Sequence, residues 1–110
     1  MRQFLVDEIP RRQMETIKSY LKNNTSTSGL DSVYWLEVPP DLLAAVQLDH
    51  HSCGPHYLAI EVGKDFIKFE FLVRSRHRLR CDCVRYADAA QESFLLDFAH
   101  SLIETLHLSC

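Results

Sequence analysis

The segment from Asp49 to His56 concentrates side chains that bind metal ions or act as nucleophiles. Three of the six histidines of the chain lie in it, together with one of the four cysteines. Zinc prefers imidazole nitrogen and thiolate sulfur ligands that converge in a tetrahedron. Zinc binding at this loop is therefore one hypothesis. Its candidate ligands are His50, His51, Cys53 and His56, and Cys81 or Cys83 is a further source of a ligand.

The same loop also suits a thiol-dependent function centred on Cys53. A neighbouring histidine lowers the pKa of a thiol when the imidazole is charged, and it can also accept the thiol proton. Against both ideas, the paired Cys-x-x-Cys spacing typical of zinc sites is absent from the chain. We therefore expect no cofactor and no catalytic activity, with zinc binding or thiol chemistry as the alternative.

A second group of chemically distinctive residues is the basic segment from Arg74 to Arg80. Between Lys64 and Arg85 the sequence has seven lysines and arginines (64, 68, 74, 76, 78, 80, 85) against three acidic residues (65, 70, 82), a difference of +4. Such a segment attracts phosphates or an acidic protein partner. Basic side chains at a hairpin tip also protect a sheet from unwanted edge pairing. Nucleic-acid binding through this segment is a second alternative.

Alternating and β-branched segments predict the sheet that positions these residues. From Tyr57 to Tyr86 apolar residues recur at every second position, which predicts an antiparallel meander with one buried face. A tight turn is expected at Gly63-Lys64-Asp65. The expected strands number about four, namely Val33–Val38, His56–Val62, Phe66–Arg74 and Arg78–Tyr86.

Three helices complete the predicted fold. Apolar residues at spacings of three and four predict a helix over Pro10–Asn23 and a longer one after Asp88, which has Gln91 at the capping-box position. A short helix is expected over Asp41–Leu48. The order α-β-α-β-β-β-α predicts a single α+β domain over residues 1–110, with the first and last helices packed on an antiparallel sheet.

The alternation also assigns the faces of the sheet. One face is almost wholly apolar and includes Cys81 and Cys83 as core residues, whereas the other mixes aromatic and charged side chains. Unless the short helix or Phe4–Val6 covers it, this mixed face is typical of an interface. We expect it to bind another protein or a second copy in a homodimer. The residues concerned are Trp35, Tyr57, Leu72, Arg74, Arg76, Arg78, Arg80 and Tyr86.

Composition excludes several function classes. The 110 residues carry a formal net charge of −3, which gives no global reason for binding nucleic acid or an anionic membrane. No segment approaches the roughly 20 apolar residues of a membrane span. The first residues turn acidic too early for a signal peptide, so we expect a cytoplasmic protein with reduced cysteines. The sequence thus predicts a small non-catalytic binding or regulatory module.

Overall fold

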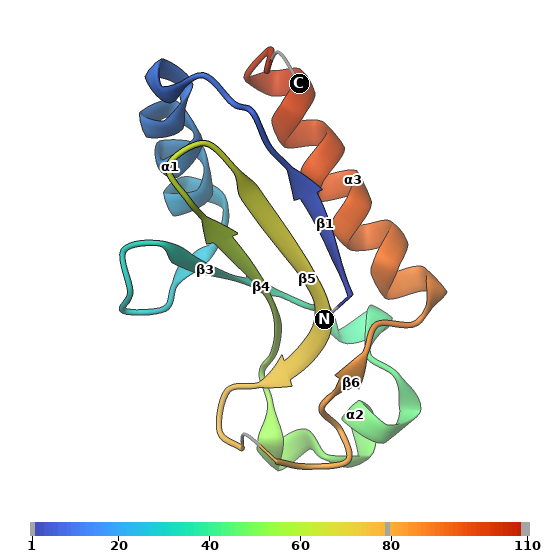
Figure 1. Ribbon diagram of the computed structural model, residues 1–110. Helices are drawn as coiled ribbons and strands as arrows, with labels where there is room; N and C mark the ends of the chain where they lie inside the picture. Colours follow the sequence, from blue (N-terminus) through green and yellow to red (C-terminus); the bar gives the residue numbers. More distant parts are fainter. Residues whose placement is uncertain (1, 79, 109–110) are drawn as a thin grey trace.

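The computed structural model describes residues 2–78 and 80–108 and has an antiparallel sheet with two long helices (Figure 1). The strands follow the order β1-β5-β4-β3-β2, and β6 pairs with β5. This arrangement confirms the predicted α+β class. The strands are β1 (Gln3–Val6), β2 (Ser26–Thr27), β3 (Val33–Glu37), β4 (His56–Val62), β5 (Ile67–Ser75) and β6 (Arg85–Tyr86). The helices are α1 (Arg11–Asn24), α2 (Ala45–Asp49) and α3 (Ala89–Thr105), with 3-10 turns at Pro40–Leu42 and His51–Cys53.

The hydrophobic core lies between one face of the sheet and the apolar stripes of α1 and α3. Alternate residues of β3, β4 and β5 are buried together with one stripe from each helix, as the periodicity predicts. Burying one such aliphatic or aromatic side chain contributes about 1.5–3 kcal/mol to folding. The buried strand residues are Tyr34, Leu36, Leu58, Ile60, Val62, Ile67, Phe69 and Val73, and the helix residues are Met14, Ile17, Leu21, Leu95, Ala99 and Leu102.

The prediction of a long last strand over Arg78–Tyr86 is wrong. Among the described residues of that range, only Arg85–Tyr86 forms a strand, and the chain before it turns, with the Val84 N–H donating to the Cys81 carbonyl at 2.9 Å. β1 occupies the edge of β5 from Ile67 to Glu70, so a third meander strand cannot pair along the whole of β5. Leu79, assigned to the core by the alternation, lies outside the described residues.

Two other elements also differ from expectation. The segment Phe4–Val6 extends the sheet as part of β1 and does not cover its second face. The helix expected over Asp41–Leu48 is split into the 3-10 turn at Pro40–Leu42 and the short α2. Leu42 and Leu43 of this segment pack against the core. Tyr57 and Ala59 of the mixed face are nevertheless buried, so the expectation that Tyr57 is exposed for an interface is wrong.

A bulge in β5 lies where this strand meets the segment before β1 and the segment before α3. Leu58 pairs with Val73 and Ile60 with Phe69, so the single residue Ala59 lies opposite three residues of β5. In the bulge, the Phe71 N–H donates to the Arg2 carbonyl at 3.1 Å, and the Phe71 carbonyl accepts from the Ala87 N–H at 2.7 Å. The strand β5 thereby holds the N-terminal strand and the entry to α3.

Two buried glutamines connect α3 to α2. The amide group of Gln91 donates to Gln47 Oε1 at 2.9 Å and to the Leu42 carbonyl at 2.8 Å, and each glutamine is only 1% exposed. Gln91 also completes the predicted capping box, since its Oε1 accepts from the Asp88 N–H and its own N–H donates to Asp88 Oδ1. Gln47 Nε2 in turn donates to the Cys83 carbonyl at 3.2 Å. The network therefore runs from the start of α3 to the cysteine-bearing segment.

Replacing Gln91 with leucine tests this network. The substitution leaves the Leu42 carbonyl, Gln47 Oε1 and the Asp88 N–H without this partner. An unsatisfied buried polar group costs about 1–3 kcal/mol, so we expect the free energy of unfolding to fall by about 2–4 kcal/mol in urea denaturation. Gln13→Leu is the matched control, because Gln13 Oε1 is buried without a hydrogen-bond partner among the described residues. Equal effects of the two substitutions would contradict a structural role of the network.

Candidate metal centre

Four side chains converge at the end of the sheet where β5 stops, near α2 (Figure 1). Their candidate ligand atoms all lie within 4.8 Å of one another. In a tetrahedral zinc site with Zn–S bonds of about 2.3 Å, two sulfurs are about 3.8 Å apart. Cys53 Sγ and Cys81 Sγ are 3.7 Å apart, which matches this spacing. We refer to the four residues, His50, Cys53, Cys81 and Cys83, as the His–Cys cluster.

The β4–β5 hairpin brings the two halves of the cluster together. His56 at the start of β4 pairs with Ser75 at the end of β5, so the segments before His56 and after Ser75 leave the sheet side by side. The Ser75 hydroxyl donates to the Cys53 carbonyl and accepts from the N–H groups of His77 at 3.3 Å and Arg78 at 3.1 Å. One buried hydroxyl thus connects the two loops.

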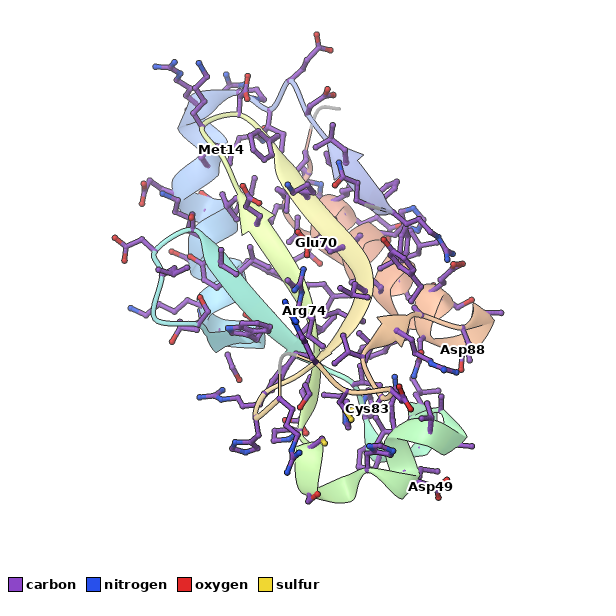
Figure 2. The ribbon with its side chains drawn as sticks, turned by 60° about the horizontal axis from the view of Figure 1, so that its bottom comes forward. Met14, Asp49, Glu70, Arg74, Cys83 and Asp88 are labelled. Atoms are coloured by element: carbon purple, nitrogen blue, oxygen red, sulfur yellow. The ribbon has the colours of Figure 1, made fainter. Side chains whose placement is uncertain are left out.

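Local hydrogen bonds orient each ligand. His50 follows the last residue of α2, and its carbonyl accepts from the Cys53 N–H at 2.8 Å across the 3-10 turn. His50 Nδ1 lies 2.9 Å from Cys81 Sγ, a hydrogen-bond distance that a shared ion would lengthen. Cys83 is held through its carbonyl by Gln47. In Figure 2, Cys83 lies near the lower end of the molecule, with Asp49 of α2 below it.

The thiols of the cluster differ in their tendency to ionise. Hydrogen bonds from the backbone and side chain of Cys83 lower the pKa of Cys81 to about 7, and Cys53 and His50 contribute in the same direction. Burial raises the pKa of Cys83 to about 12, since a thiolate is poorly solvated there. Metal ligation requires thiolates, and a bound cation deprotonates a coordinating thiol. The cluster therefore offers one readily ionised sulfur, that of Cys81, beside the Cys83 thiol, which needs a cation to lose its proton.

The burial and the number of the candidate ligands indicate what kind of metal site the cluster can form. Cys53 and Cys83 are 3% and 0% exposed, whereas His50 and Cys81 are half-buried. An ion could enter from the more exposed side, where His50 and Cys81 lie, and would then contact the buried Cys53 and Cys83. Four protein ligands fill a tetrahedron and leave no position for a substrate, which is the arrangement of structural zinc sites.

The structure places the residues proposed from sequence in different environments. His50 and Cys53 belong to the cluster, whereas His56 is the first residue of β4 on the core face, is 2% exposed and lies outside the cluster. The side chain of His51 lies outside the described part of the chain. Cys81 and Cys83, assigned to the core of a strand and also named as a further source of a ligand, are both cluster members and lie in a loop. The spacings His-x-x-Cys and Cys-x-Cys, considered as a pair, are the signal that would have grouped them.

The residues proposed for the interaction face lie in two groups. In the first, Trp35 packs edge-on against Tyr57 with ring centroids 5.6 Å apart, and the Arg76 guanidinium lies 5.8 Å from the Tyr57 ring. Arg74 bridges Glu70 at 2.9 Å on the same face of β5 (Figure 2), and Arg78 and Arg80 are exposed. In the second, Leu72 pairs with Tyr86, which contacts Arg2.

No protein-family model, curated protein or solved structure matches the chain. Within residues 2–78 and 80–108, none of the helices combines the length and apolarity that crossing a bilayer requires.

The buried His56 predicts acid sensitivity of the chain without metal. Burial, and secondarily the charge of His50, lowers its pKa below the ordinary value of 6.5. The unfolded chain therefore binds the proton more tightly than the folded chain does. The stabilising contribution of neutral His56 is fully present above pH 6.5 and is lost as the pH decreases from 6.5 through the lower folded pKa. We expect His56→Phe to lose less unfolding free energy than the natural chain between pH 7.5 and 5.5, measured in urea with chelator present. His77→Phe, at an exposed position, controls for removal of a histidine.

Proposed function

We propose that this chain is a zinc-binding protein whose single ion is held by the His–Cys cluster. The observation that carries the proposal is the convergence of one imidazole and three thiol groups, with ligand atoms within 4.8 Å, from two loops that are far apart in the sequence. A free cysteine that only packs as a small apolar side chain does not require an imidazole and two further thiols beside it.

The ligand set favours zinc over other common ions. Three thiolates and one imidazole are soft to borderline ligands, whereas magnesium and calcium take oxygen ligands in larger numbers. The cluster contains no carboxylate among its four members. The sulfur spacing of 3.7 Å also suits the tetrahedral geometry that zinc adopts in structural sites.

The proposed role of the ion is structural. It joins the 3-10 turn before β4 to the segment before β6, neither of which has strand pairing of its own at the cluster. An ion that binds only the folded chain stabilises it by mass action, by about 4 kcal/mol when its concentration is about 1,000 times Kd. With all four positions filled by protein, the site supports a non-catalytic protein.

A binding role for the mixed sheet face is the second part of the proposal. Trp35 and Arg76 both contact the buried Tyr57 ring and form an aromatic and basic surface directly beside the segment that the ion would fix. Aromatic and arginine side chains in contact are the types that contribute most to protein interfaces. The ion would then hold a recognition surface for a protein partner or a second copy of the chain.

Native mass spectrometry of the untagged chain, purified without chelator, tests the metal proposal. We expect one zinc ion per chain, lost in Cys53→Ser, Cys83→Ser and His50→Ala because each removes one of four ligands. Cys110→Ser and His77→Ala are matched controls that should retain the ion. The same spectrum shows whether the chain is the homodimer predicted from its mixed face. A metal-free chain, or zinc retained by all three ligand variants, would contradict the proposed site.

Cobalt substitution tests the coordination number separately. Cobalt(II) in a tetrahedral site with thiolate ligands gives intense visible absorption and a thiolate charge-transfer band, whereas a six-coordinate ion does not. We expect the intense spectrum in the natural chain and its loss in Cys83→Ser. A weak octahedral spectrum would exclude the closed four-ligand site and with it the structural role.

A further inference from the structure

We infer that the segment from Arg76 to Val84, called here the arginine loop, binds an acidic peptide segment of a partner protein. One carboxylate of that peptide would enter a small cavity between the loop and Trp35. The inference rests on the proposed zinc site, because the ion would hold the loop in place. It specifies the chemistry of the partner that the mixed face recognises.

The cavity has the dimensions and lining of a carboxylate pocket. Its volume is about 60 Å³, and it is lined by Trp35, Arg74, Ser75, Arg78 and Val84. One water needs only about 10–15 Å³ of such space, so the cavity has room for a carboxylate group. Trp35 and Val84 supply apolar walls, and the two arginines supply the charge.

The two arginines of the cavity have different partners. Arg74 is neutralised by Glu70 at 2.9 Å, so its charge is already compensated. Arg78 is exposed and makes no ion pair within the described part of the chain. Its guanidinium can donate two parallel hydrogen bonds to one carboxylate, the geometry in which arginine binds most specifically. The backbone N–H of Arg78 is meanwhile fixed on the Ser75 hydroxyl at 3.1 Å.

The charge around the cavity is complementary to an acidic segment. From Arg74 to Arg85 the sequence has five arginines and a single acidic residue, Asp82. Arg76 and Arg80 are both exposed, at positions flanking Arg78. An extended peptide with several carboxylates would therefore meet a run of positive charge after the first carboxylate is bound.

The same observations favour a peptide over single-stranded nucleic acid. Proteins that bind single strands stack bases on exposed aromatic rings, but Tyr57 is only 5% exposed and lies beneath Arg76.

The His–Cys cluster anchors the arginine loop at several points. Cys81 and Cys83 belong to the loop, and the Arg76 N–H donates to the Pro55 carbonyl at 3.1 Å, two residues after Cys53. The Ser75 hydroxyl joins the start of the loop to the Cys53 carbonyl. Loss of the ion would release the segment that carries Arg76, Arg78 and Arg80, so peptide binding should depend on zinc.

Fluorescence anisotropy with a fluorescein-labelled octaglutamate peptide tests the inference on the full chain loaded with zinc. We expect saturable binding that weakens as salt rises from about 0.05 to 0.2 M, because exposed charges are screened. Arg78→Gln should weaken binding at least about tenfold, since it removes a charge-assisted pair. Arg12→Gln, an equal charge change at an exposed position of α1, should leave the affinity as it is.

The outcomes separate this inference from the zinc proposal. Zinc bound at one ion per chain without octaglutamate binding, or equal losses in Arg78→Gln and Arg12→Gln, would overturn the inference and leave the metal site standing. Tighter binding of labelled oligo-dT of matched charge would overturn it in favour of nucleic acid. Binding that survives complete zinc removal by chelator would refute the coupling between ion and loop. Absence of zinc from the native spectrum would instead overturn the proposed function.

Discussion

The end of the molecule that carries the His–Cys cluster depends on the hydrogen bonds of the Ser75 hydroxyl. This hydroxyl donates to the Cys53 carbonyl and accepts from the N–H groups of His77 and Arg78, while its own residue closes the β4–β5 ladder opposite His56. Both cysteine-bearing segments are thereby positioned relative to the sheet before any ion is considered. Because the hydroxyl is buried, water does not compete for these bonds, and their geometry is maintained.

The core and the cluster are connected by the glutamine network. Gln91 belongs to α3, Gln47 belongs to α2, and the Cys83 carbonyl belongs to the segment that carries two candidate ligands. Packing of α3 on the sheet therefore places α2, and α2 in turn places His50 at its end and Cys83 beside it. The cluster is best described as an extension of the folded core, and the proposed ion as the element that completes it.

Much of the fold follows from local patterns, but the candidate site does not. Periodicity predicts α1, α3 and the strands β3 to β5 because each buries one continuous stripe or face. It fails for β1, whose four residues are fixed only by pairing with distant β5. Cys81 and Cys83 alternate with polar residues as strand residues do, so one pattern fits both a core strand and a pair of ligands. Cys81, in the second half of the site, follows Cys53 by 28 residues, and only the hairpin brings the two cysteines together.

The bulge opposite Ala59 restricts how the length of β5 can vary. Three residues of β5 lie opposite one of β4, an excess of two, so the residues before and after the bulge keep the same orientation toward the core. Unless the bulge itself absorbed it, a gain or loss of one residue here would turn every following side chain over. Ser75 would then face away from Cys53, and Arg74 would enter the core. A change of two residues at this site preserves both orientations without such an adjustment, so the length of this bulge is coupled to the geometry of the His–Cys cluster.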